Sequence, residues 1–288
     1  MTPELPLVSV GIPTYNRPEG LKRTLDCITR QTYKNLEIIV SDNCSPTDET
    51  EKIVKAFAEK DKRIKFFKHS ENKGAVFNFT FVMEKATGHF FMWAADDDEW
   101  ASEFVEACVS GLLNNPGIPL AFTNIEAIDV FDRKYREVPS YMKFNGRDSF
   151  GTIYRYLMDW EYLGKACLIY GVYRLEKLKE LFYHFCHGKS GFGVDMSFVL
   201  ATISRGGIYV DDRILFKKKN PLLATTKETV YFEKIDYSKK FDFKVSDFVQ
   251  YARNSLQSVR GTKYYLLAII VFGYRMSRIY YFKKIKRG

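Results

Sequence analysis

Residues 88–100 read Gly-His-Phe-Phe-Met-Trp-Ala-Ala-Asp-Asp-Asp-Glu-Trp, and this stretch decides the fold that we expect. The run at 90–95 is mostly apolar and does not alternate, which indicates a short strand buried on both faces. Four acids follow it directly, at 96–99. Because neighbouring like charges repel, the cluster costs stability unless a cation or solvent offsets it. The stretch therefore predicts either a site for a hard divalent cation at the end of a buried strand or a solvated acidic turn.

On the N-terminal side of this stretch, strand and helix patterns alternate. Strand patterns cover 7–12, 36–40 and 64–68, and helical patterns cover 19–31, 77–86 and the segment from Ser45 or Thr47 to about residue 60. This alternation predicts a parallel sheet with helices on both faces, in which ligands bind outside the carboxyl ends of the strands. Polar segments follow three of the strands, at 14–16, 42–43 and 96–98. We therefore expect these segments to converge on one edge of the sheet.

The C-terminal side continues the core with less regular spacing. We expect helices over 101–114, 149–161 and 175–185, strands over 120–124, 166–173 and 207–216, and a helix that opens at Asp195. We divide the chain into a catalytic domain over 1–225, with halves at 1–100 and 101–225, and a basic, aromatic-rich helical tail over 226–288.

The bulk composition is that of a globular protein. The 288 residues are 46% hydrophobic and 27% charged, which allows a sizeable core and excludes a disordered chain. The five cysteines are scattered and never spaced as Cys-x-x-Cys, so we expect no disulfide framework or zinc site and a cytoplasmic location. We also expect no signal peptide, because the N-terminus has no basic segment followed by an apolar run.

The tail carries most of the positive charge. Residues 213–288 hold 18 Lys and Arg against 5 Asp and Glu, a net charge of +13, whereas the whole chain carries +9. Eleven apolar residues at 264–274 are too few to span a bilayer. A basic amphipathic helix over 263–288 that lies on an anionic membrane fits this pattern. A helix packed on the catalytic domain and a homodimer contact remain the alternatives.

Taken together, four motifs resemble glycosyltransferase family 2. They are Val-Ser-Val-Gly-Ile-Pro-Thr-Tyr-Asn-Arg at 8–17, Leu-Glu-Ile-Ile-Val-Ser-Asp-Asn at 36–43, Asn-Lys-Gly at 72–74, and Gly88 with the acids that follow it. The resemblance covers residues 6–125 well and the middle of the chain loosely. It implies the α/β GT-A fold, a mixed and mostly parallel sheet flanked by helices, here with a C-terminal helical extension. It also implies an inverting transfer of a sugar from a nucleotide-sugar donor, typically a UDP-sugar, to a glycan or lipid-linked glycan acceptor, as in bacterial surface polysaccharide synthesis.

The resemblance places the donor at the ends of the strands in residues 1–100. Thr14 and Tyr15 match the loop that lines the nucleotide, and Asp42 matches the acid that accepts an N–H of the base. Asn72 and Gly74 match the loop near the ribose and phosphates. The expected nucleotide-sugar contacts are Pro13, Thr14, Tyr15, Arg17, Asp42, Asn72, Gly74, Asp96 and Asp97. Ordinary turn and capping roles are the alternative for Asp42, Asn72 and Gly74.

The acids match the Asp-x-Asp metal motif of the family, with a departure. Many relatives have the first Asp of the motif where this chain has Ala95. The resemblance therefore assigns Mg²⁺ or Mn²⁺ to Asp97 or Asp98 and places Asp96 nearer the ribose. Such a cation would clamp the diphosphate and stabilise the leaving group. A basic turn at 217–219 could contact the diphosphate too, or simply be solvated.

Asp195 is the expected catalytic base. It follows a glycine-rich segment, and inversion at an anomeric carbon needs one base that takes the proton of the attacking hydroxyl. The position resembles the catalytic acid of the family, although Val194 replaces a common Glu. The alternative is that Asp195 merely caps a helix and favours its dipole.

Three other functions are less well supported by the sequence. A nucleotidyltransferase would need a glycine-rich, basic phosphate loop after the first strand, and residues 13–16 are not one. A non-catalytic nucleotide-sugar-binding module would not need Asp42, the acidic cluster and Asp195 together. We expect no nucleic-acid partner, because the basic end carries no recognised motif.

Overall fold

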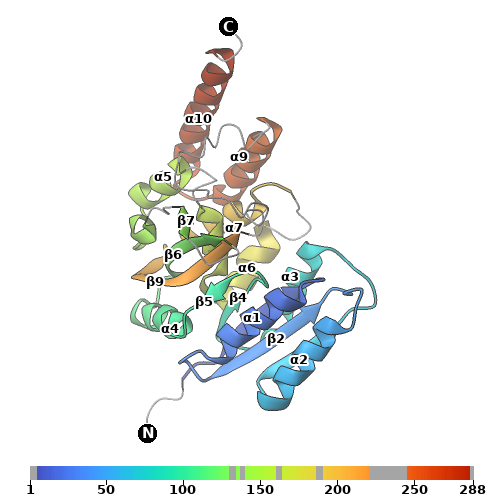
Figure 1. Ribbon diagram of the computed structural model, residues 1–288. Coiled ribbons are helices and arrows are strands. Elements are labelled where there is room, and N and C mark those ends of the chain that lie inside the picture. Colours follow the sequence, from blue (N-terminus) through green and yellow to red (C-terminus); the bar gives the residue numbers. More distant parts are fainter. Residues whose placement is uncertain are drawn as a thin grey trace.

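The computed structural model describes residues 5–129, 134–136, 140–159, 164–185, 191–220 and 245–285. Within these residues a nine-stranded sheet has the order β3-β2-β1-β4-β8-β6-β9-β5, and β7 pairs with β6 (Figure 1). The strands are β1 (Val8–Thr14), β2 (Leu36–Asp42), β3 (Ile64–Lys68), β4 (Phe90–Trp93), β5 (Glu99–Trp100), β6 (Leu120–Asp129), β7 (Lys134–Arg136), β8 (Val172–Arg174) and β9 (Tyr209–Asn220). The helices are α1 (Pro18–Thr29), α2 (Glu49–Lys60), α3 (Ala75–Glu84), α4 (Phe104–Asn114), α5 (Phe150–Met158), α6 (Leu175–Phe185), α7 (Val194–Ile203), α9 (Val245–Val259) and α10 (Tyr265–Ile285), with 3-10 helices η1 (Tyr141–Phe144) and η3 (Lys165–Tyr170).

The first four strands form the parallel part of the sheet. Strands β1, β2 and β4 are buried at every position, which explains their unbroken apolar runs. β1 lies between β2 and β4, and the register places Thr14 opposite Asp42. The parallel ends therefore meet at one edge, and the expected mixed α/β sheet flanked by helices is confirmed.

The second half of the sheet is mixed. β8 is antiparallel to β4 and β6, β9 is parallel to β6, and β5 is antiparallel to β9. The strand expected over 166–173 is wrong over most of its length, because 165–170 is η3 and only 172–174 is a strand. Cys167 and Leu168 are buried, and a short buried run looks the same in either structure.

The basic segment at 217–219 is a strand and not the expected turn. β9 continues to Asn220 because it pairs with β6 along this stretch, and β5 pairs with it at Lys217 and Phe216. This pairing sets Lys218 and Lys219 beside the acids that follow β4. Lys218 and Asp98 are thus neighbours in the structure, although 120 positions separate them in the sequence.

Hydrogen bonds to Glu37 link the strands around the start of β4. Its carboxylate accepts hydrogen bonds from the Ser9 hydroxyl, from the backbone and hydroxyl of Thr87, and from Lys65. The Ser9 oxygen also accepts the backbone N–H of Gly88 at 2.8 Å. These bonds join β1, β2 and β3 to the start of β4 and so fix where β4 begins.

Helices α9 and α10 lie side by side at the end of the molecule opposite α2 (Figure 1). α9 packs on α7, and α10 packs on α5 and α9. A C-terminal helical extension is therefore confirmed, whereas the boundary at 225/226 lies outside the described residues and stays a prediction. In the described residues, no helix has both the length and the apolar character needed to cross a membrane.

Candidate active site

Hydrogen bonds join the loop after β1 to the acids after β4. The Thr14 hydroxyl donates to Asp96 Oδ2 at 2.7 Å. Arg17 Nη1 lies 3.1 Å from Asp96 Oδ1 and 2.9 Å from Asp97 Oδ2. Burial raises the pKa of Asp96, although Thr14 and Arg17 act in the opposite direction. The edge thus brings together four of the expected donor-contact residues, while Pro13 is buried in β1 and Tyr15 is exposed.

Asp42 has an oxygen without a partner. Its Oδ1 accepts hydrogen bonds from the backbone N–H and the hydroxyl of Ser45, at 3.0 and 2.6 Å. Its Oδ2 is buried and has no hydrogen-bond partner. An unsatisfied buried acceptor costs roughly 1–3 kcal/mol. Asp42 can therefore accept an N–H from a ligand, which an acid that served only to cap a turn would not need.

The loop at 72–74 is held against Asp42 by its neighbour Asn43. Asn43 Nδ2 donates to Asn72 Oδ1 at 2.8 Å and to the Gly74 carbonyl at 3.1 Å. Asn43 Oδ1 accepts the backbone N–H of Lys73 at 3.0 Å. Gly74 has φ 85°, a conformation that favours glycine. Asn72 and Gly74 therefore lie at the same edge as Asp42.

Asn78 is a site residue that the sequence pattern does not indicate. This buried amide donates to the carbonyls of Thr14 and Ser41, at 3.2 and 3.0 Å, and accepts the Ser41 hydroxyl. These hydrogen bonds of Asn78, on helix α3, hold the ends of β1 and β2 together. In the sequence, Asn78 is recognisable only as a single amide residue among the mostly apolar residues of α3.

Lys218 belongs to the basic segment at 217–219, which the sequence indicated as a diphosphate contact or a solvated turn, but its contact with the acids was not predicted. Its Nζ lies 2.8 Å from Asp98 Oδ2 and 3.6 Å from Asp97 Oδ1. Asp98 Oδ1 accepts the backbone N–H of Lys219 at 3.2 Å. The Asp98 side chain is 0% exposed, whereas that of Asp97 is 26% exposed. The charge of the acidic cluster is therefore offset by Lys218 on one side and Arg17 on the other.

The acids fit a divalent cation that the substrate helps to bind, and not a closed protein cage. In the part of the chain that the structure describes, no three His, Cys, Asp or Glu side chains converge as a metal site. Arg17 and Lys218 contact Asp97 as well, but the Asp97 side chain is partly exposed, whereas Asp98 is fully buried with hydrogen bonds to both oxygens, so Asp97 is the more accessible carboxylate. Mg²⁺ is commonly bound by one or two carboxylates together with substrate phosphates and waters. Asp97 can supply such a carboxylate.

Asp195 lies in the first turn of α7, after Gly193 with φ 75°. Its Oδ1 accepts the backbone N–H of Met196 at 2.7 Å. Burial raises the pKa of its carboxyl group. Within the described residues, no hydrogen bond or ion pair links Asp195 to the acidic cluster or to Asp42, so the structure leaves its catalytic role a prediction.

The comparison with protein families gives a match over more than half of the chain. The family model described as "Glycosyl transferase family 2" matches residues 9–182. This range contains the strand-end edge with Thr14, Asp42 and Asp97. It ends before Asp195.

Curated relatives match shorter segments. The GalNAc(5)-diNAcBac-PP-undecaprenol beta-1,3-glucosyltransferase of Campylobacter jejuni is 38% identical over 99 residues, which cover 34% of this chain and 32% of that protein. The UDP-Glc:alpha-D-GlcNAc-diphosphoundecaprenol beta-1,3-glucosyltransferase WfgD of Escherichia coli is 32% identical over 123 residues, which cover 43% of this chain and 47% of that protein. The chain therefore spans less than half the length of either relative.

Solved structures share the fold over most of the chain. S. aureus TarS, residues 1–349 in complex with UDP-GlcNAc, has a TM-score of 0.66 at 17% identity and covers 92% of this chain and 70% of its own. The mannosyltransferase PcManGT from Pyrobaculum calidifontis, in complex with GDP-Man and Mn²⁺, has a TM-score of 0.53 at 17% identity and covers 89% and 64%. At this identity the likeness concerns the fold alone.

Proposed function

The chain belongs to glycosyl transferase family 2, and from this premise we propose that it is an inverting glycosyltransferase. It moves a sugar from a nucleotide-diphosphate donor, a UDP-sugar, to a hydroxyl of a glycan or lipid-linked glycan. The observation that carries this proposal is the edge of the sheet, where Asp42 keeps a buried, unpartnered oxygen close to a loop held by Asn43. A uracil ring offers one N–H that this oxygen can accept.

The acidic cluster would lie at the diphosphate end of the donor. Asp97 would hold Mg²⁺ or Mn²⁺, because it is the accessible carboxylate beside the buried Asp98. When bound, the cation neutralises charge on the diphosphate. Arg17 and Lys218 keep the acids ordered, and Thr14 fixes the orientation of Asp96.

Asp195 would act as the base. It accepts the proton of the acceptor hydroxyl while the oxygen of that hydroxyl bonds to the anomeric carbon, and the bond from that carbon to the diphosphate oxygen breaks with its electron pair on the nucleotide. The configuration inverts because attack and departure occur on opposite faces. Burial raises the pKa of Asp195, which makes the carboxylate a stronger base than a solvated one.

The names of two relatives support a lipid-linked acceptor, because both specify undecaprenol diphosphate glycans. The outer face of α10 supports a peripheral membrane contact through residues 263–288. Leu266 and Ile270 are 66% and 60% exposed there, although large aliphatic side chains are mostly buried in globular proteins. Such an enzyme would work at the cytoplasmic face of the membrane.

Calorimetric titration with UDP-sugars, GDP-sugars and UTP, with and without Mn²⁺, tests the proposal. We expect a UDP-sugar to bind in the presence of Mn²⁺ and Asp42→Ala to weaken that binding. Preference for UTP, with release of pyrophosphate when a sugar phosphate is added, would instead show a nucleotidyltransferase. Donor binding without transfer to any lipid-linked or free glycan would favour the non-catalytic module.

A further inference from the structure

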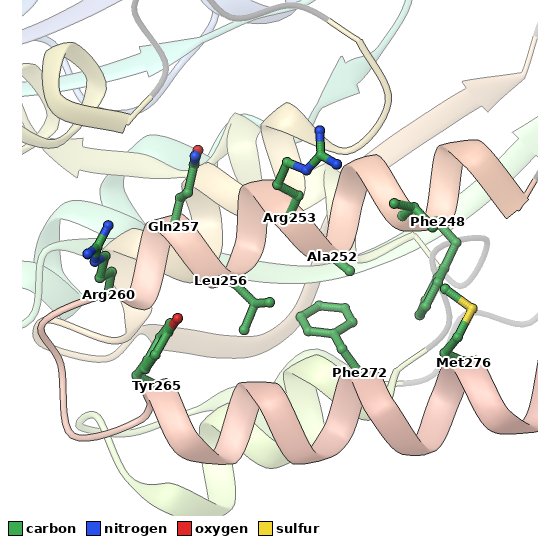
Figure 2. Close-up of a pocket in the computed structure, with 10 residues that line it drawn as sticks. Phe248, Ala252, Arg253, Leu256, Gln257, Arg260, Tyr265, Phe272 and Met276 are labelled. Carbon is green, nitrogen blue, oxygen red and sulfur yellow. The ribbon is translucent and has the colours of Figure 1, made fainter.

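Helices α9 and α10 enclose a groove of about 400 Å³ that the proposed reaction does not use. This volume lies in the range of about 300–1,000 Å³ typical of small-molecule sites. Figure 2 shows the apolar side chains between the two helices. They are Phe248, Ala252, Leu256, Phe272 and Met276, with Tyr265 at one end.

Two arginines line the groove, Arg253 on α9 and Arg260 directly after the last residue of that helix. Arg253 and Arg260 point away from α10 in Figure 2. Both are exposed, and among the described residues neither guanidinium has a hydrogen-bond or ion-pair partner. A guanidinium binds phosphate oxygens in a bidentate manner, so each arginine offers an anion-binding group at the edge of the apolar groove.

The groove adjoins a helix face that is apolar on its outer side. Ile269, Tyr274 and Tyr280 are 42%, 50% and 71% exposed on α10, together with Leu266 and Ile270. Residues 245–285 contain seven Lys and Arg but one acid, Asp247. A surface with cations near exposed aromatic and aliphatic side chains is suited to the boundary between headgroups and acyl chains.

We propose that the groove binds an anionic phospholipid of the bilayer, with acyl carbons between α9 and α10 and the phosphate against Arg253 and Arg260. Charge complementarity selects this occupant. A second copy of the chain would bring two strongly basic surfaces together, which is unfavourable. The proposal rests on the proposed membrane contact of the tail, and it does not depend on glycosyl transfer.

The test is flotation of the full chain with three kinds of vesicle, made of phosphatidylcholine alone, with 30% phosphatidylglycerol, or with a few per cent undecaprenyl phosphate. We expect binding to the phosphatidylglycerol vesicles. The pair Arg253→Gln and Arg260→Gln should lower the partition coefficient roughly 30-fold, since each basic residue near an anionic surface contributes about 1 kcal/mol. Ala252→Phe, which fills the groove without a change of charge, should lower it several-fold.

The matched control is Lys60→Gln with Lys62→Gln, which removes two exposed cations from the opposite end of the molecule and should leave partition within about twofold. All variants are checked by urea unfolding and by donor calorimetry, so that loss of vesicle binding is separated from unfolding and from failure of the donor site. Equal partition of the wild type and the arginine variant overturns the proposal. So does an unchanged Ala252→Phe variant, binding to the undecaprenyl phosphate vesicles alone, or a dimer in sedimentation that Ala252→Phe dissociates.

Discussion

Lys218 Nζ lies 2.8 Å from Asp98 Oδ2 and ties β9 to the loop that follows β4. Because Asp98 is fully enclosed and burial raises its pKa to about 7 despite Lys218, removal of this cation would leave a buried carboxyl group without its charge partner. Lys218→Met should therefore lower the free energy of unfolding by roughly 3–5 kcal/mol. The measurement is urea unfolding followed by circular dichroism.

The neighbouring Lys217 gives the control, since it is exposed and Lys217→Met should change stability by less than about 0.5 kcal/mol. In the double variant Lys218→Met with Asp98→Asn, most of the loss should be recovered because no buried charge remains. Equal stability of the wild type and Lys218→Met would show that the pair contributes nothing.

Asp97 and Asp98 should differ in what their loss affects. Asp97→Asn should weaken Mn²⁺-dependent donor binding by at least about tenfold and leave stability nearly unchanged, because its carboxylate is accessible. Asp98→Asn should mainly destabilise the protein, because it removes the buried and closer counter-charge of Lys218 and leaves only Asp97, at 3.6 Å. Calorimetric titration at several Mn²⁺ concentrations, beside urea unfolding of each variant, separates the two effects. The reverse pattern would move the metal to Asp98.

Transfer should be lost at low pH through Asp195. Burial raises the pKa of this carboxyl group above its ordinary value of about 4, and a base works only when ionised. The value of kcat/KM should thus fall as the pH drops through that raised pKa. Asp195→Asn should reduce kcat roughly 10²- to 10⁴-fold with unchanged donor affinity. If the variant transfers sugar at the normal rate, Asp195 only caps α7.

The convergence of the strand ends on one edge of the sheet was predicted from the sequence, because it follows from local patterns. Strands buried on both faces give unbroken apolar runs, and parallel register carries Thr14 and Asp42 to the same edge. Lys218 was not predicted as a partner of Asp98, because the hydrophobic pattern of a sequence does not indicate which strand lies beside a distant loop. The 3-10 helix at 165–170 was predicted as a strand, since burial on both sides makes the two patterns alike.

Glu37 should make the protein sensitive to acid. Burial would raise the pKa of its carboxyl group, but hydrogen bonds from Lys65, Ser9 and Thr87 outweigh burial and lower that pKa from 4.5 to about 2. A group with a lowered pKa stabilises the fold above its unfolded pKa and loses this contribution as the pH falls through the folded pKa. Between pH 4.5 and 2 the protein should therefore lose about 3 kcal/mol of stability through this residue.

The variant Glu37→Gln should be less stable at pH 7 and should have a flatter pH dependence between pH 4.5 and 2. The exposed Glu59 on α2 provides the control, because Glu59→Gln should run parallel to the wild type over the same range. Urea unfolding in steps of half a pH unit measures all three proteins. Parallel curves for Glu37→Gln and the wild type would mean that Glu37 does not couple the start of β4 to the strands beside it, and another contact would have to set the position of the acidic stretch.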